Sequence, residues 1–406
     1  MDLNGRSILL AVSGGVAAYK AAELCRLLVK EGASVQVVLT AAAARFVGAA
    51  TFQALSGRPV VTDLWESPVA DGMPHIGLTR AADLIVVAPA TADVLGKAAN
   101  GIADDLLSTL LLASNKPVLF APAMNREMWA HPATQRNVAR LREDGALISG
   151  PAAGEQACGE VGEGRLVEPE DLLQDIVAAL QPKVLAGRRV LVTAGPTFEP
   201  IDPVRGLTNR SSGKMGYAVA RAAREAGAQV VLVSGPTALA TPHGVQRVDV
   251  ETAQQMFDAV MAHIAQSDVF VAVAAVADWR PAQTLPHKLK KQEGQHAPAL
   301  ELAPNPDILA SVAALPDAPF CVGFAAESDK LIEHAAAKRA RKGVPLLLAN
   351  LGPQTFGRDD NALELFDSSG HRPLGRGSKI DLARRLIAEI AARLPASPAG
   401  DGGSTG

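Results

Sequence analysis

The sequence predicts an α/β protein built from two parallel-sheet domains. Short apolar runs of strand length alternate with amphipathic helical patterns, as in successive βαβ units. Aromatic residues make up only 4% of the 406 residues, and aliphatic residues dominate, which favours α/β layers over an aromatic-rich β-sandwich. Glycine-rich or polar turns follow several of the apolar runs, at the edge where open α/β sheets bind ligands.

Composition narrows the class of protein. A chain of 406 residues suggests two or three domains, and 39 basic against 42 acidic residues leave a net charge of −3, which argues against a strongly basic nucleic-acid binder. The three cysteines, Cys25, Cys158 and Cys321, form too sparse a set for a disulfide framework. No apolar run reaches the roughly 18 residues of a membrane span, and the first residues lack a signal-peptide pattern. We therefore expect a cytoplasmic protein without a membrane partner.

The first half of the chain reads as a series of strands and helices. The strand Ser7–Ser13 is broken by Gly14 and Gly15, and residues 16–32 follow as an amphipathic helix. Further strands are expected at Ser34–Thr40, Leu84–Ala88 and Pro117–Ala121. Helical sequence follows these strands, which predicts a parallel sheet with right-handed crossovers.

The alternation stops around Ser149–Arg165, where glycine and small residues dominate. This composition predicts a long mobile loop. A closing helix is expected at Glu168–Leu180, and residues 181–189 read as a linker with Pro182 and Gly187.

A second α/β unit begins with the strand Arg189–Thr193 and has a helix that starts near Ser212. Further strands are expected at Gln229–Ser234, Val269–Ala274, Phe320–Phe324 and Pro345–Ala349. The last helical pattern is Lys379–Leu394, and the polar tail after it is expected to be disordered. We place the domains at residues 1–187 and 188–394, with a tail of residues 395–406.

Four features of the first half point to a ligand site. The turn at Gly14 and Gly15 has the free amides and helix dipole that attract phosphate, although many such glycines serve geometry alone. Asn125 follows a strand, where its amide can hold a carboxylate. His75 gains interest from a possible pairing with Asn125 and Cys158, although a lone histidine is usually structural. Cys158 sits in the glycine-rich stretch, where a chemical role competes with a surface accident.

The second half carries a longer connection, residues 193–216, dense in Gly, Pro, Ser and Asn. Its helix start at Ser211–Gly216 and Lys214 suit a triphosphate. Asp278 ends a buried strand and is a candidate for Mg²⁺ or a base edge. Lys288 opens the run KLKK, which is either a solvated charged face or a source of transition-state stabilisation. Lys338 and Lys342 are one helical turn apart and could clamp phosphates.

Two common nucleotide signatures are absent. No G-x-G-x-x-G follows a strand, and the stretch Gly206–Met215 has the wrong spacing for a P-loop, with Met215 where Ser or Thr would bind Mg²⁺. A dinucleotide dehydrogenase and a P-loop kinase are both disfavoured.

Taken together, the motifs resemble two enzyme families in one chain. The segments GGVAAYK, APATAD, GIADDLLST, PAMNREMW and ACGEVGEGR resemble the flavin-dependent cysteine decarboxylases. The segments GPTFEPIDPVR, TNRSSGKMG, AAVADW, KLKK, NPDIL and GFAAE resemble the phosphopantothenate–cysteine ligases. Both sets in this order resemble the bacterial bifunctional enzymes of coenzyme A biosynthesis. The resemblance covers almost all of the chain except the tail, and implies two Rossmann-like domains, the first flavodoxin-like.

For the first domain the resemblance implies FMN-dependent decarboxylation of 4′-phosphopantothenoylcysteine to 4′-phosphopantetheine. FMN would oxidise the substrate's cysteine thiol, so that the carboxylate can leave as CO₂. Cys158 matches the family's proton donor, His75 its active-site histidine, and Asn125 the residue that contacts the substrate's carboxylate. The implied FMN-binding residues are Ser13, Gly14, Gly15, Thr40, Ala90 and Thr91.

For the second domain the resemblance implies ligation of cysteine to 4′-phosphopantothenate. The substrate's carboxylate would attack CTP to give an acyl-cytidylate, and the cysteine amine would then displace CMP, with Mg²⁺ held by Asp278. Asn209 and Arg205 match residues around the acyl intermediate, and Lys288 matches the catalytic lysine. The implied CTP-binding residues are Ser211, Gly213, Gly216, Ala274, Ala275, Asp278, Lys288, Pro306, Asp307, Ile308, Leu309, Phe324, Lys338 and Lys342.

The sequence departs from the common family pattern at two positions. Asp93 stands where Asn is frequent, and Phe198 stands where Arg is frequent. Neither change removes a predicted catalytic residue.

Two other classes compete with the bifunctional enzyme. A non-catalytic FMN-binding phosphatase subunit would need a degenerate second half, yet Asn209, Asp278 and Lys288 are all present. A flavin prenyltransferase would lack a second domain of this kind. The resemblance also implies a homo-oligomer, a dodecamer of decarboxylase trimers and ligase dimers.

Overall fold

The computed structural model describes residues 1–65, 74–290, 299–327, 330–351 and 357–395. The chain forms two compact units, residues 1–181 and 182–406. Residues 182–187, which the sequence analysis assigned to the first domain, pack with the second. Leu185 is buried in the second unit's core, and its N–H donates to the carbonyl of Ala226. The expected disorder concerned residues 395–406, of which residues 396–406 lie outside the described residues.

In the described residues of the first unit, five parallel strands form one sheet in the order β2-β1-β3-β4-β5. This is the strand order of flavodoxin-like folds, so the predicted fold class is confirmed. The elements of the sheet and its helices are β1 (Ser7–Val12), α1 (Ala18–Lys30), β2 (Ser34–Leu39), a 3₁₀ turn (Ala43–Arg45), α2 (Ala49–Ser56), α3 (Pro74–Ala81), β3 (Leu84–Ala90), α4 (Ala92–Asn100), α5 (Leu106–Leu112), β4 (Val118–Pro122), α6 (Arg126–Ala130), α7 (Pro132–Glu143), β5 (Leu147–Ile148) and α8 (Pro169–Ala179).

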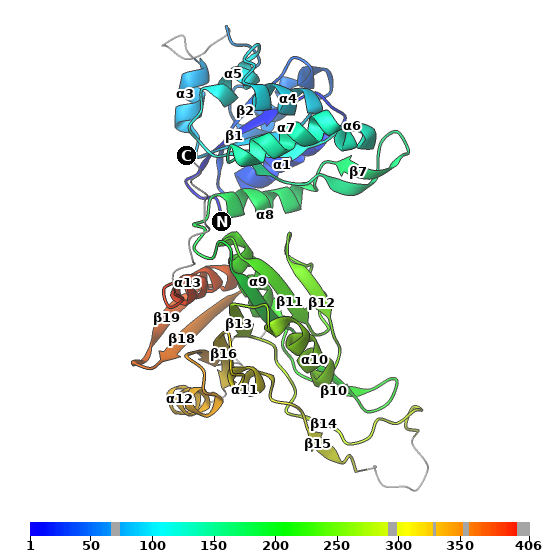
Figure 1. Cartoon of the computed structure of the whole chain (residues 1–406), viewed down its shortest axis with the longest axis vertical. Helices are drawn as coiled ribbons and strands as arrows, with labels where there is room; N and C mark the ends of the chain where they lie inside the picture. The colour runs from blue at the N-terminus through cyan, green and yellow to red at the C-terminus, as the bar shows by residue number, and fades with distance from the viewer. Residues whose placement is uncertain (66–73, 291–298, 328–329, 352–356, 396–406) are drawn as a thin grey trace, which may run out of the picture. The chain divides into compact units, whose positions relative to one another are not determined.

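Helices cover both faces of this sheet, as Figure 1 shows. Because successive side chains of a strand point to opposite faces, β1 serves two cores. Ile8 and Leu10 pack with α1, α2 and α8 on one face. Leu9 and Ala11 pack with α4, α5 and α7 on the other. This three-layer arrangement leaves the carboxyl ends of the strands free for the loops of a site.

The expected mobile loop at Ser149–Arg165 is wrong. The segment contains an antiparallel hairpin, β6 (Ala152–Glu155) and β7 (Val161–Arg165). Its glycines permit a close approach rather than mobility. Gly164 has φ +134°, and a Cβ there would come 2.3 Å from the carbonyl oxygen of Met124. The hairpin is thus packed directly against the segment that follows β4.

In the described residues of the second unit, eight strands form one sheet in the order β12-β11-β8-β13-β16-β17-β18-β19. The first six are parallel and have the order of Rossmann folds. The elements are β8 (Arg189–Ala194), β9 (Phe198–Pro200), β10 (Gly206–Thr208), α9 (Lys214–Glu225), β11 (Gln229–Ser234), β12 (Gln246–Asp249), α10 (Ala253–Ile264), β13 (Val269–Ala272), β14 (Trp279–Pro281), β15 (Leu302–Pro304), α11 (Ile308–Ala313), β16 (Phe320–Glu327), α12 (Leu331–Lys342), β17 (Leu346–Leu351), β18 (Asp360–Asp367), β19 (Gly370–Ser378) and α13 (Lys379–Ala391).

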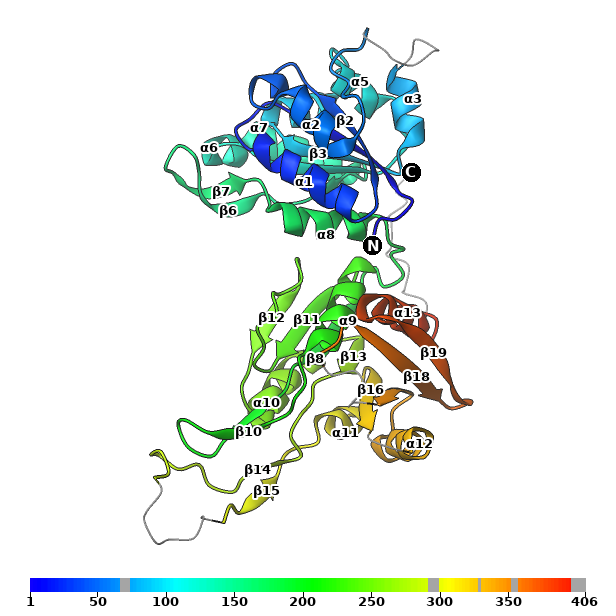
Figure 2. The same cartoon turned by 180° about the vertical axis from the view of Figure 1, so that it is seen from behind.

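Two hairpins in this unit were absent from the sequence prediction. The antiparallel pair β18–β19 extends the sheet beyond β17. The short pair β9–β10 occupies the connection between β8 and α9. Figure 2 shows β14 and β15, a third short pair, extending away from the large sheet of the unit as an arm. Helices α9 and α13 pack on one face of the sheet, and α10, α11 and α12 on the other.

Candidate functional site

The first unit has a cavity of about 680 Å³ at the carboxyl ends of its strands. Gly14 and Gly15 after β1, Thr91 after β3, and Asn125 after β4 line it, together with Cys158 from the β6–β7 hairpin. This position is the topological switch point between β1 and β3, where flavodoxin-like sheets bind ligands.

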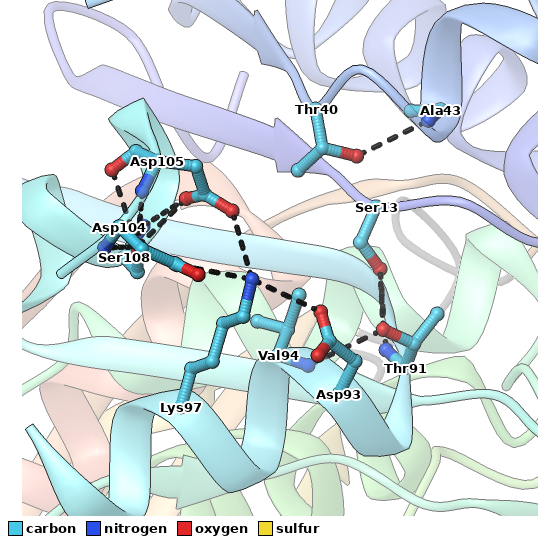
Figure 3. Close-up of polar contacts among 10 residues, drawn as sticks. All are labelled: Ser13, Thr40, Ala43, Thr91, Asp93, Val94, Lys97, Asp104, Asp105 and Ser108. Carbon is cyan, nitrogen blue, oxygen red and sulfur yellow. Dashed lines mark hydrogen bonds and ion pairs between the residues drawn. The ribbon is translucent and has the colours of Figure 1, made fainter. Parts of the chain in front are cut away.

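Hydrogen bonds join the two loops of this switch point (Figure 3). The buried hydroxyl of Ser13 donates to the Pro89 carbonyl at 2.7 Å and accepts the Thr91 N–H at 3.2 Å. Thr91 in turn caps α4 by accepting the N–H of Val94 at 3.4 Å. Ser13 therefore holds the loops together from behind, whereas Thr91 faces the cavity.

The remaining predicted FMN residues also fall into two groups, those that line the cavity and those that lie behind it. Thr40 accepts the N–H of Ala43 at 3.1 Å, as Figure 3 shows, and Ala90 is fully buried. Among the described residues, Ser13, Thr40 and Ala90 do not line the cavity, whereas Gly14, Gly15 and Thr91 do. A Cβ on Gly14 would lie 2.4 Å from the Cβ of Ala42, while one on Gly15 would meet nothing within 4 Å. The glycines thus bring bare backbone to the cavity at the start of α1, a geometry that suits a phosphate.

Asn125 and Cys158 come together across the cavity. The Asn125 amide lies 3.8 Å from the Cys158 sulfur, and Cys158 is exposed. A third residue, Glu160, accepts a hydrogen bond from the Asn125 amide at 2.5 Å and lies 3.7 Å from the Cys158 sulfur. The sequence analysis missed Glu160, because only the hairpin geometry brings it back over β4.

Side-chain contacts fix the hairpin to the segment that carries Asn125. The Gln156 side chain accepts the N–H of Arg126 at 3.1 Å, and Glu163 accepts the indole N–H of Trp129 at 3.1 Å. Trp129 is thus buried in packing, while Met124, Asn125 and Met128 line the cavity.

His75 lies apart from this group. It sits in the first turn of α3 and does not line the cavity of the described residues. Its Nδ1 atom is buried and has no hydrogen-bond partner among the described residues. The possible pairing of His75 with Asn125 and Cys158 is therefore absent from the described part of the chain.

Asp93, which departs from the family pattern, belongs to a charge cluster on α4. Its carboxylate lies 3.4 Å from the Lys97 ammonium, which also reaches Asp104 at 3.0 Å and Asp105 at 3.4 Å (Figure 3). The hydrogen bond to Asp104 raises the pKa of Lys97, although burial opposes the shift. Asp93 thus turns toward Lys97, while its neighbours Thr91 and Ala92 line the cavity.

The second unit has a cavity of about 550 Å³ at the carboxyl ends of β8, β13, β16 and β17. The switch point of this sheet lies between β8 and β13, so the cavity occupies the position of a Rossmann ligand site. Most of the predicted nucleotide and catalytic residues line it, namely Asn209, Ser211, Gly213, Ala274, Ala275, Asp278, Pro306, Asp307, Ile308, Leu309, Phe324, Lys338 and Lys342.

The loop before α9 lies at the cavity and is held by its own polar side chains. Asn209 accepts the N–H of Ser211 at 3.1 Å, and the Ser211 hydroxyl accepts that of Gly213 at 3.3 Å. Gly213 has φ +77° at the start of the helix, a conformation that favours glycine. Gly216 has a different role from the predicted nucleotide contact, because a Cβ there would lie 2.5 Å from the Cβ of Ala194 on β8. It lets α9 pack closely on the sheet.

Cations surround this cavity on two sides. Lys338, Arg341 and Lys342 come from α12, whereas Lys214 and Lys379 come from the starts of α9 and α13. Lys342 pairs with Asp307, and the Lys214 ammonium lies 2.6 Å from Asp359. Burial and the nearby Lys214 lower the pKa of Lys379. The arrangement suits a ligand with several phosphate charges.

Arg205 and Lys288 stand outside the residues that line this cavity in the described part of the chain. Arg205 lies in the turn between β9 and β10, where its guanidinium binds the buried carboxylate of Asp202 at 2.6 Å. Lys288 is exposed on the arm between β14 and β15, and Lys291 of the same KLKK run lies outside the described residues. The structure thus brings Asn209 to the cavity and leaves Arg205 and Lys288 beyond it.

Phe198, the second departure from the family pattern, also has a structural explanation. A Cβ on Gly206 would lie 2.4 Å from the ring carbon Cζ of Phe198. The ring therefore covers Gly206 in the adjacent strand and stabilises the β9–β10 hairpin.

Two absences concern the described residues. They contain no group of three or more His, Cys, Asp or Glu side chains that could hold a metal ion. None of their helices has the length and apolar character needed to cross a membrane.

The fold is that of a two-domain α/β protein with a cavity at the switch point of each sheet. Family models match both halves: "Flavoprotein" matches residues 1–181, and "DNA/pantothenate metabolism flavoprotein C-terminal domain" matches residues 185–394. The Coenzyme A biosynthesis bifunctional protein CoaBC of Vibrio parahaemolyticus is 49% identical over 392 residues, which cover 96% of this chain and 98% of the relative. The chain therefore belongs to the family of bifunctional coenzyme A biosynthesis proteins, and the resemblance found in the sequence is confirmed.

Solved structures resemble each half separately. The crystal structure of a CoaBC C-terminal domain is 39% identical, with a TM-score of 0.45, covering 52% of this chain and 97% of that one. A PPC decarboxylase mutant complexed with pantothenoylaminoethenethiol is 36% identical, with a TM-score of 0.38, covering 42% of this chain and 96% of that one.

Proposed function

We propose that this protein catalyses two consecutive steps of coenzyme A biosynthesis. The second domain joins cysteine to 4′-phosphopantothenate with CTP, and the first decarboxylates the resulting 4′-phosphopantothenoylcysteine to 4′-phosphopantetheine. The observation that carries the proposal is the pair of cavities, one at the switch point of each sheet, lined by residues of the matching family motifs. Membership of the bifunctional family supports both activities.

FMN suits the first cavity. Gly14, Gly15 and Thr91 would hold its phosphate, with Ser13, Thr40 and Ala90 shaping the loops behind them. Met124 and Met128 offer apolar wall for a flavin ring. When bound, FMN would accept and return the two electrons that make loss of CO₂ feasible.

The chain's own residues then orient the substrate and move a proton. The Asn125 amide donates to the substrate's carboxylate and so fixes the bond that breaks. The Cys158 thiol, exposed on the hairpin beside Asn125, supplies a proton to the decarboxylated product. We assign the proton to Cys158 because it is the thiol at this cavity, whereas Cys25 and Cys321 are buried.

In the second domain the cavity would take CTP. Pro306, Leu309 and Phe324 provide the apolar contacts for the nucleotide, and Lys338 and Lys342 provide the positive charge. Asn209 lines the cavity from the loop before α9, where its side-chain amide can hold the carboxylate of 4′-phosphopantothenate as it attacks the α-phosphate. Asp278 would hold Mg²⁺, which reduces the charge on the triphosphate. Arg205 and Lys288 would act on the acyl intermediate, although neither lines the cavity in the described part of the chain.

The test uses the purified full chain with 4′-phosphopantothenate, L-cysteine, Mg²⁺ and CTP. We expect a flavin absorption spectrum and the release of 4′-phosphopantetheine, CMP, pyrophosphate and CO₂, detected by mass spectrometry. Accumulation of 4′-phosphopantothenoylcysteine would contradict the decarboxylase assignment alone. A colourless protein without CTP-dependent pyrophosphate release would contradict both.

We also propose a homo-oligomer, a dodecamer built from decarboxylase trimers and ligase dimers, working in the cytoplasm. Light scattering coupled to size-exclusion chromatography measures its mass directly. A monomeric mass at micromolar concentration would contradict the oligomer.

A further inference from the structure

Asp202 is a fully buried carboxylate in the turn between β9 and β10. Its Oδ1 accepts the backbone N–H groups of Val204 and Arg205, both at 2.9 Å. Its Oδ2 accepts two hydrogen bonds from the Arg205 guanidinium, one from Nε at 3.0 Å and one from Nη2 at 2.6 Å. A carboxylate that is buried and paired in this way has its full complement of hydrogen bonds.

The same carboxylate reaches a second segment, 87 residues away in the chain. The Oδ2 atom of Asp202 accepts the N–H of Leu289 at 3.1 Å. The Arg205 guanidinium also binds this residue, by donating a hydrogen bond to the Leu289 carbonyl at 2.7 Å. Both backbone groups of the residue next to Lys288 are therefore held by the Asp202–Arg205 pair.

Two further contacts align the arm with the turn. The N–H of Leu285 donates to the carbonyl of Ile201 at 2.9 Å, and the hydroxyl of Thr284 donates to the carbonyl of Pro200 at 3.3 Å. Residues 284–289 thus run beside the turn between β9 and β10. Asp202 binds the last residue of this segment, Leu289. Hydrogen bonds from Arg205 hold the pKa of Asp202 well below its usual range, so the carboxylate keeps its charge at neutral pH.

The hairpin is itself anchored to the body of the domain. Glu199 is buried, and its carboxylate accepts the N–H of Ala253 at the first turn of α10, at 2.9 Å. The N–H of Phe198 donates to the Glu251 carbonyl at 2.8 Å. A firm base therefore carries the turn that holds Asp202.

We propose that Asp202 is a positioning residue of the ligase reaction, which holds Arg205 and the backbone beside Lys288 as one unit. The inference rests on the proposed function, which assigns catalytic roles to Arg205 and Lys288. Asp202 itself is buried and is not among the described residues that line the cavity. Its role is to keep two charged side chains from distant segments in a defined relation, which matters because misplacing a catalytic group by about 1 Å can cost roughly 100-fold in rate.

The test is the Asp202→Asn variant in the full chain, which keeps the side-chain shape and loses the charge. We expect kcat for CTP-dependent pyrophosphate release to fall by about 100-fold. The KM for CTP should stay near the wild-type value, because Asp202 lies outside the cavity residues. Flavin content and decarboxylase activity on 4′-phosphopantothenoylcysteine report on the other domain and should be unchanged.

The matched control is Glu225→Gln. Glu225 is also a buried carboxylate of the second domain bound by arginines, with Arg221 at 2.9 Å and Arg384 at 2.7 Å. It lies at the end of α9, away from the cavity. If the control lost as much ligase kcat as Asp202→Asn, the effect would come from general destabilisation and the proposal would be overturned.

Two further measurements separate positioning from mere folding. In a Lys288→Gln background, Asp202→Asn should lower kcat by a smaller factor than it does in the wild type, because part of its action passes through Lys288. Limited trypsin digestion should cut after Lys288 or Lys290 faster in Asp202→Asn than in wild type. Full additivity of the two substitutions, or an unchanged kcat in the single variant, would overturn the proposal. An inactive wild-type ligase would instead signal failure of the proposed function.

Discussion

The two cavities differ in how their predicted residues reach them. In the first domain, Asn125 and Cys158 meet at the cavity wall, 3.8 Å apart. In the second, the strand-end residues gather around the cavity, while Arg205 and Lys288 remain outside it on a hairpin and an arm. Residues at strand ends thus reach a cavity chiefly through the sheet, whereas the hairpins and the arm depend on side-chain anchors such as Glu163 and Asp202.

The largest effect should come from Cys158→Ser. We expect the variant to bind flavin and to release CO₂. Formation of 4′-phosphopantetheine should be slower by about 100-fold or more, because a positioned proton donor typically raises the rate by roughly 10²–10⁴-fold. Rapid-quench mass spectrometry would follow the stalled product. Cys25→Ser, a buried thiol in the same domain, is the control. Wild-type turnover by Cys158→Ser would remove the thiol from the mechanism.

The next effect should come from Lys288→Gln, on the other side of the comparison. We expect ligase kcat to fall by about 100- to 1,000-fold, in line with loss of one transition-state donor. Decarboxylase activity should persist, since it belongs to the other compact unit. The neighbouring substitution Lys290→Gln controls for the charge of the arm. An equal loss of both activities in Lys288→Gln would indicate misfolding instead of catalysis.

A smaller effect should come from Glu160→Gln. In the structure the Asn125 amide donates a hydrogen bond to the Glu160 carboxylate. We assign the same amide to the substrate's carboxylate, so Glu160 competes with the substrate for it. A neutral amide competes less well, because a hydrogen bond to a charged group is worth about 1 kcal/mol more than a neutral one. The KM for 4′-phosphopantothenoylcysteine should therefore fall by about fivefold, measured as CO₂ release. A raised KM would show that Glu160 assists substrate binding.

The smallest effect should come from Asp367, which forms structural contacts and does not line the cavity in the described residues. Asp367 of β18 binds Ser369 and Arg393, and these contacts lower its pKa to about 2. Because the folded pKa lies below the unfolded value of about 4, the contribution is present above pH 4 and is lost as the pH falls toward 2. Asp367→Asn should reduce the free energy of unfolding by about 1–2 kcal/mol at pH 7 and by little at pH 2, measured by urea denaturation. Both enzyme activities at pH 7 should be unchanged.

The hairpins mark the limit of prediction from sequence. Glu160 and the β6–β7 pairing escaped because the glycine-rich composition of residues 149–165 looks like a loop, while Gly164 in fact permits contact with Met124. The strands β18 and β19 escaped because the α/β alternation predicts only parallel strands. His75 gained interest from a possible pairing with Asn125 and Cys158, and it does not line their cavity in the described residues.

Local sequence patterns predict the two parallel α/β units, the glycine turns after β1 and before α9, and membership of the bifunctional family. These features depend on the spacing of apolar residues and on short motifs, both of which can be recognised within a short stretch of sequence. Only the tertiary structure decided that Glu160 lies against Asn125 and that Asp202 holds Leu289, across 35 and 87 residues of chain. The physical reason is that a buried carboxylate finds its donors wherever the packing of distant segments places them, and no local pattern records that choice.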